Sequence, residues 1–267
     1  MNENYIKNVY VVALCLIVLS GCAAISQPQI DNSSNNDGSN IDATQENRSG
    51  NIYAQMGLEY MKAGQPDVAL RKLKRGLSID PNNPQIYAVL GRLYELLGKP
   101  KFAEEHYLRS IELEPNNSFF RNAWGSFLCQ QGEYERADVE FRKALNNPLY
   151  NKPWDAKTNA GVCALRAGRR EDGENYLKQA LAANPNIPLA LAKLAQIKLE
   201  SKNYIEAQQY LARYEQNSIP SPSSLLLKCK VALGLKDQAM ARDCKEKLIQ
   251  SFPDAPETKT ARELVLP

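Results

Sequence analysis

The side chains that could do chemistry in this 267-residue chain are six cysteines and a single histidine, His106. One histidine excludes most histidine-based metal sites, and no nucleophile motif lies near it that would complete a catalytic triad. The sequence contains no GxxxxGK or GxGxxG phosphate-binding loop and no GxSxG or HExxH motif. It therefore predicts a protein with no catalytic residue, no metal site and no cofactor.

Cys22 is the cysteine whose surroundings point most clearly to a reaction. Residues 9–19 are an apolar run, which is too short to span a bilayer because that takes about 20 residues. Residues 19–22 (LSGC) then resemble a lipobox, in which a peptidase cuts before a cysteine whose thiol carries diacylglycerol. We expect residues 1–21 to be a lipoprotein signal peptide and Cys22 to be lipidated. The alternative is a plain signal peptide with an incidental cysteine.

The segment after Cys22 has few apolar side chains. Residues 22–49 are rich in Asn, Ser, Gln and Asp, and so little apolar surface cannot offset the entropy of ordering. We predict a flexible tether here, with an ordered extension as the alternative. Ala23 follows the cysteine, and by resemblance to the lipoproteins of Gram-negative bacteria this favours the outer membrane, with the fold at its periplasmic face.

The rest of the chain is organised by a repeat. Residues 84–117 read as one helix-turn-helix unit of 34 residues, in which Tyr87 and Tyr94 share a face of the first helix, Gly98 ends it, and Ala103 is buried in the second. The same marks recur along the chain at the tetratricopeptide period. The predicted repeats are 50–83, 84–117, 118–151, 154–187, 188–219 and 220–252, followed by a C-terminal tail, 253–267.

The predicted fold is all-α, a right-handed superhelical solenoid whose first helices line a concave groove. An ordinary helical bundle would not predict the period. Positions 2, 5, 9, 12 and 13 of each first helix are expected to face the groove, and in the first three repeats they form an unusually apolar stripe. A peptide could bind there, or some of these side chains could pack against the next repeat or the tether. The candidate binding residues are Leu58, Met61, Arg92, Leu96, Phe119 and Asn122.

Four cysteines remain in the predicted fold, and disulfides are possible in an exported protein. Cys129 and Cys163 lie at similar heights on neighbouring first helices, so a bridge between them is geometrically reasonable. Folding the last hairpin about Gly234 leaves Cys229 well short of Cys244, and the state of that pair stays open.

The charge pattern gives no case for nucleic acid as a partner. The formal net charge is +3, from 33 basic and 30 acidic residues, and the chain has no basic stripe and no aromatic RNA-binding motif. No feature indicates a small-molecule substrate. Binding of another protein is the remaining interpretation.

Three segments carry a resemblance to a known family: residues 124–132 (WGSFLCQQG), 147–150 (NPLY) and 159–168 (NAGVCALRAG). They resemble the type IV pilus biogenesis and stability lipoproteins called PilF or PilW. The resemblance implies a pilotin on the inner leaflet of the outer membrane that supports assembly of the pilus secretin, whose subunit is the implied partner. It also implies a disulfide between Cys129 and Cys163. A scaffold for peptidoglycan-modifying enzymes, or for another outer-membrane assembly machine, is the alternative function.

Overall fold

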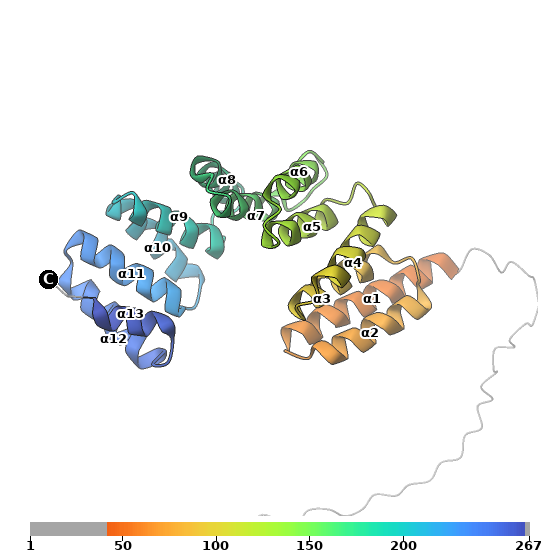
Figure 1. The fold of residues 1–267 in the computed structure, drawn as a ribbon, viewed down its shortest axis with the longest axis horizontal. Coiled ribbons are helices and arrows are strands. Elements are labelled where there is room, and N and C mark those ends of the chain that lie inside the picture. Colours follow the sequence, from red (N-terminus) through yellow and green to blue (C-terminus); the bar gives the residue numbers. More distant parts are fainter. Residues whose placement is uncertain (1–41, 265–267) are drawn as a thin grey trace, which may run out of the picture. The chain divides into compact units, whose positions relative to one another are not determined.

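The computed structural model describes residues 42–264, and in this range it contains thirteen helices and no strand. Six consecutive helix pairs form hairpins, and α13 packs against both helices of the last pair (Figure 1). The predicted all-α repeat fold is confirmed. The helices are α1 (Asp42–Lys62), α2 (Pro66–Ile79), α3 (Pro84–Leu96), α4 (Pro100–Leu113), α5 (Ser118–Gln130), α6 (Tyr134–Leu145), α7 (Pro153–Arg166), α8 (Arg170–Ala183), α9 (Pro188–Glu200), α10 (Tyr204–Asn217), α11 (Pro222–Leu235), α12 (Gln238–Ser251) and α13 (Pro256–Glu263).

The starts of the first helices are encoded locally. Proline opens α3, α7, α9, α11 and α13, where its fixed φ suits the helix and its missing N–H is not needed. Asn83 Oδ1 accepts a hydrogen bond from Ile86 N at 3.0 Å, and Asn117 Oδ1 accepts one from Phe119 N at 3.0 Å. These caps satisfy backbone donors that have no partner within the helix. The direction in which each new hairpin leaves the previous one is thus set by a few residues.

The turns inside the hairpins show the repeat most directly. Gly64, Gly98, Gly132 and Gly168 have φ of +70°, +66°, +83° and +76°, the left-handed conformation that ends many helices. In the last two hairpins, lysine stands at this place, with φ of 60° at Lys202 and 58° at Lys236. The sixth hairpin therefore turns at Lys236, and not at Gly234 as the sequence suggested.

Replacing Lys202 or Lys236 by glycine is expected to raise the free energy of unfolding by about 1 kcal/mol, because the left-handed conformation crowds the β-carbon of every L-residue. Gly64→Ala is the reciprocal control. A β-carbon there meets nothing within 4 Å, so only backbone strain changes and stability should fall. Urea titrations of the three variants measure both effects. Unchanged stability in the lysine variants would contradict the assigned backbone.

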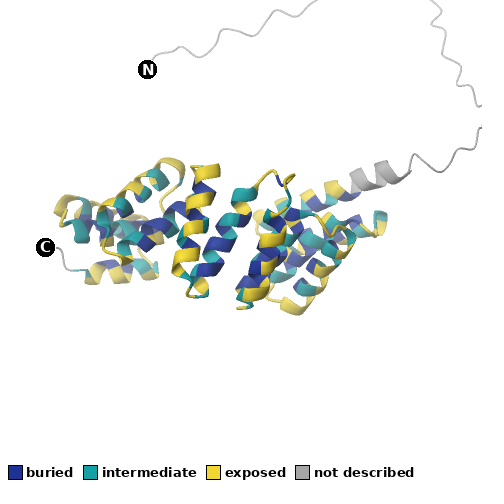
Figure 2. Cartoon of the chain, turned by 90° about the horizontal axis from the view of Figure 1, so that it is seen from above, coloured by how far each residue is buried: buried dark blue, intermediate teal, exposed yellow. Residues whose placement is uncertain are grey.

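The two helices of each hairpin meet where glycine lets them approach. A β-carbon at Gly91 would lie 2.8 Å from the ring of Tyr107, and one at Gly125 would lie 2.9 Å from Phe141. The aromatic side chain of the second helix therefore occupies the space that a larger residue would need. Buried residues recur along the whole array in separate clusters (Figure 2), as expected when each repeat packs only against its neighbours.

Both ends of the repeat array differ from the sequence prediction. Helix α1 begins at Asp42, so residues 42–49, predicted as part of the tether, extend the first helix. These eight residues contain neither proline nor glycine, and extending an existing helix costs far less than nucleating one.

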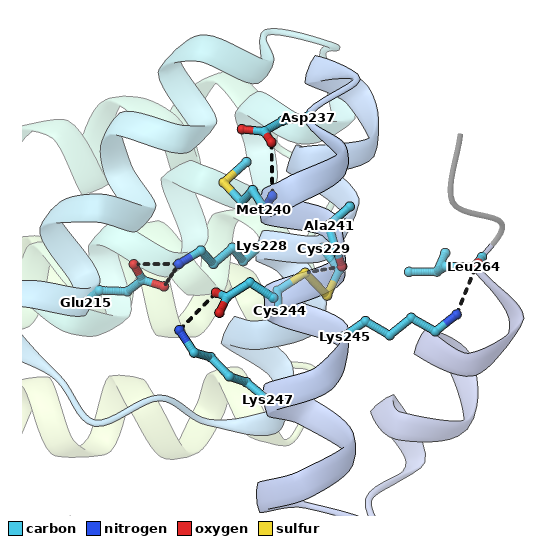
Figure 3. The surroundings of a disulfide bond; sticks show 11 residues. Glu215, Lys228, Cys229, Asp237, Met240, Ala241, Cys244, Lys245, Lys247 and Leu264 are labelled. Carbon is cyan, nitrogen blue, oxygen red and sulfur yellow. Dashed lines mark hydrogen bonds and ion pairs between the residues drawn. A yellow bond between two sulfur atoms is a disulfide. The ribbon is translucent and has the colours of Figure 1, made fainter.

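At the other end, the predicted tail contains α13. Its first residue, Pro256, follows Pro222 by one 34-residue period, so α13 stands at the place of the first helix of a seventh repeat. Lys245 Nζ donates a hydrogen bond to the carbonyl oxygen of Leu264 at 3.1 Å, just after α13 (Figure 3). It also donates one to the carbonyl oxygen of Arg262 at 3.2 Å. The helix covers the apolar side of the last hairpin, as a capping repeat does.

Cys229 and Cys244 form a disulfide between α11 and α12, with their Cα atoms 5.6 Å apart (Figure 3). The sequence argument against this geometry was wrong because it folded the hairpin about Gly234. Cys229 lies seven residues before Lys236 and Cys244 lies seven residues after Asp237. The two cysteines therefore face each other across the turn.

Candidate partner-binding groove

A groove of about 540 Å³ lies over the first helices α1, α3 and α5. Four of the six candidate residues line it, namely Leu58, Met61, Arg92 and Leu96, together with Lys62, Glu95 and Gln130. All seven come from positions 9, 12 and 13 of their repeats. Successive helices present the same positions to the same side because each repeat contacts its neighbour in the same way.

We call this groove the N-terminal groove. Its apolar side chains differ in how much of their surface is exposed and available to a partner. Leu58 and Met61 are half-buried and pack against the core cluster of the first two repeats. Leu96 is 61% exposed. The expectation that some stripe residues belong to the core is thus correct for the first pair. Leu96 is the apolar side chain with the most surface left for a partner.

On the polar side of the N-terminal groove, Glu95 makes hydrogen bonds to two neighbouring helices. Its carboxylate accepts a hydrogen bond from the Tyr107 hydroxyl at 2.9 Å and another from Gln130 Nε2 at 2.6 Å. Burial and the adjacent Glu95 charge raise the pKa of Tyr107, so its hydroxyl remains a donor. Arg92 is exposed and makes no ion pair with any described residue. The groove therefore offers an apolar floor beside one unpaired cation.

Phe119 and Asn122 do not line this groove. The ring of Phe119 packs edge-on against Tyr150, with the ring centroids 5.1 Å apart. Asn122 Oδ1 accepts a hydrogen bond from Asn159 Nδ2 at 3.0 Å. The two residues instead connect α5 with the loop after α6 and with α7.

The structure also contains a second groove that was not singled out from the sequence. Two adjoining hollows of about 480 Å³ and 760 Å³ lie over α7, α9 and α11, and they share Leu189, Lys193, Gln196 and Glu200 of α9. We call this surface the C-terminal groove. The sequence could have predicted part of this groove. When the groove positions of the first three repeats are extended along the 34-residue period, they reach Val162, Gln196 and Lys230.

A covalent bond joins the last helix of the N-terminal groove, α5, to the first helix of the C-terminal groove, α7. A disulfide links Cys129 of α5 to Cys163 of α7, with a Cα separation of 5.7 Å. Both sulfurs belong to buried residues in the central core cluster. A disulfide that closes a loop of this length stabilises the fold by about 4 kcal/mol in the chain-entropy model.

The other chemical candidates give no reactive site. His106 Nδ1 lies 2.8 Å from the Phe102 carbonyl oxygen, and the ring packs between Tyr87 and Tyr94. Among the described residues, no group of histidine, cysteine or acidic side chains is placed to hold a metal ion. Cys22 and residues 1–21 lie outside the described range. Within that range, no helix has the length and apolar character needed to cross a bilayer.

Known proteins match both the repeats and the whole array. Tetratricopeptide repeat models match residues 60–123 and 158–222. The type IV pilus assembly protein PilF of Pseudomonas aeruginosa is 26% identical over 201 residues, which cover 75% of this chain and 80% of that protein. The chain is a tetratricopeptide repeat protein related to PilF and PilW.

Two solved structures support the same relation. The structure of Pseudomonas aeruginosa PilF aligns with a TM-score of 0.72 at 25% identity, covering 82% of this chain and 98% of that one. A crystal structure of PilW, described as a widely conserved type IV pilus biogenesis factor, aligns with a TM-score of 0.71 at 29% identity, covering 80% and 98%. The likeness thus extends over nearly the full length of both relatives.

Proposed function

We propose that this protein is an outer-membrane lipoprotein that supports assembly of the type IV pilus secretin. The observation that carries the proposal is the relation to PilF and PilW over most of the chain. The open groove at equivalent positions of successive repeats supports it. The protein acts by binding and catalyses no reaction.

The lipid and the groove have separate tasks in this proposal. Acyl chains on Cys22 hold the protein at the periplasmic face of the outer membrane, where one chain alone would bind only marginally. The N-terminal groove takes a segment of the secretin subunit. Apolar side chains of that segment cover Leu58, Met61 and Leu96, and an acidic or carbonyl group meets Arg92. Subunits held at the membrane in this way assemble into rings there.

Deleting the gene is expected to abolish both surface pili and multimeric secretin, and the wild-type gene supplied in trans should restore them. Immunoblots of membrane samples compared before and after dissociation by boiling measure the multimeric secretin. Normal pili and normal multimers in the deletion strain would exclude the proposal. Recovery of peptidoglycan enzymes instead of secretin in a membrane pull-down would favour the alternative scaffold function.

A further inference from the structure

The C-terminal groove combines an apolar floor with an excess of positive charge. Its apolar residues come from three consecutive first helices: Val162 and Leu165 of α7, Leu189 and Leu199 of α9, and Leu226 and Leu227 of α11. Leu189 is 46% exposed. Single exposed apolar side chains are common on protein surfaces, but this apolar surface is continuous over three repeats and is open to water in the described part of the chain. Such a surface indicates a binding site.

The charges around this floor are unbalanced. The lining residues include four basic side chains, Arg166, Arg170, Lys193 and Lys230, and two acidic ones, Glu200 and Glu257. Arg170 is neutralised by Glu200, with an N–O distance of 2.9 Å. Glu257 accepts a hydrogen bond from the Ser223 hydroxyl at 2.6 Å and pairs with no described cation.

Two of the remaining cations are free to meet a ligand. Arg166 of α7 and Lys230 of α11 are exposed, and neither makes a hydrogen bond or an ion pair with another described residue. They lie on the two outer helices of the groove. Between them, α9 contributes the apolar Leu189 and Leu199 beside the polar Lys193, Gln196 and Glu200, and Lys193 contacts Gln196. A ligand that satisfies both would carry negative charge on either side of an apolar centre.

We infer that the C-terminal groove binds a peptide segment of another protein in which acidic residues flank apolar ones. Neighbouring helices lie about 8–10 Å apart, so an extended segment of about six to eight residues, at about 3.3 Å per residue, crosses all three. Apolar side chains of the segment cover the leucines, and its carboxylates pair with Arg166 and Lys230. This inference does not depend on the secretin proposal, which concerns the other groove.

The chain's own N-terminal segment is the competing occupant. The stretch after the expected lipidated cysteine, residues 23–41, carries Asp31 and Asp37 and no basic residue, so its charge has the right sign. Its large apolar residues, however, are single isoleucines, Ile25, Ile30 and Ile41, separated by polar residues. Single side chains at this spacing cannot cover a floor supplied by three helices, which favours a segment from a partner.

The test uses the full-length protein in detergent and fluorescein-labelled peptides of about ten residues. One peptide alternates leucine with aspartate, the second replaces aspartate by lysine, and the third replaces leucine by serine. Fluorescence anisotropy should show binding of the leucine–aspartate peptide and weaker binding of the other two. The double variant Arg166→Glu/Lys230→Glu should lose about tenfold in affinity for the acidic peptide and gain affinity for the lysine peptide.

The matched control is Lys74→Glu/Arg75→Glu on α2, where two exposed cations undergo the same charge change outside the groove. This control should keep the wild-type preference. Equal affinity for the acidic and basic peptides, or an equal loss in both double variants, would overturn the inference. Tighter binding after Asp31→Asn/Asp37→Asn would also overturn it, since the chain's own segment would then occupy the groove. Affinity that depends on protein concentration would instead assign the groove to a second copy.

Discussion

Replacing Phe141 by alanine is expected to lower the free energy of unfolding by about 3–5 kcal/mol. The ring is 1% exposed and belongs to the central core cluster. It fills the space that Gly125 leaves open on the facing helix, so alanine would leave a cavity between two helices that cannot close further. Urea unfolding followed by circular dichroism measures the loss.

Val139→Ala provides the matched control for Phe141→Ala. Val139 lies on the same helix, α6, but is 45% exposed, so its truncation should cost less than about 1 kcal/mol. Because repeats interact with their neighbours only, hydrogen exchange should rise mainly in α5, α6 and the adjoining helices. Similar losses for the two variants would contradict the assigned packing of the third hairpin.

Replacing Leu96 by aspartate should weaken secretin binding about 30-fold if the N-terminal groove is the contact, a loss typical of a central apolar contact in an interface. The side chain is exposed, so the variant should keep its helix content and stability. Ile205→Asp on α10 is the control, because Ile205 is 64% exposed and lines neither groove. Pull-down of secretin from membranes, with quantified input, compares the two variants. Equal recovery from both would exclude this groove as the contact.

The fold could be predicted wherever the repeat contains residues that mark a turn or a helix start by their type alone. Glycine at Gly98 and Gly132 and proline at Pro84 mark turns and helix starts without any tertiary information. The sequence prediction misplaced the turn of the sixth hairpin because the turn residue there is Lys236, whereas the first four hairpins have glycine. Only the backbone shows the left-handed turn there, and with it the distance between Cys229 and Cys244.

The N-terminal groove was partly predictable for a similar reason. Leu96 and Arg92 occupy positions whose direction follows from helical geometry alone. Phe119 occupies such a position too, but Tyr150 from the loop after α6 packs against it. That loop lies where the chain departs from the 34-residue period, and its contacts depend on a local conformation that periodicity does not determine.

Site-specific photo-crosslinking in cells tests the central claim most directly. Benzoylphenylalanine in place of Leu96 samples the N-terminal groove, and the same residue in place of Ile205 samples a surface outside both grooves. The proposal predicts that irradiation attaches the secretin subunit at position 96 and not at position 205. Adducts at position 96 that contain other proteins and no secretin would contradict it.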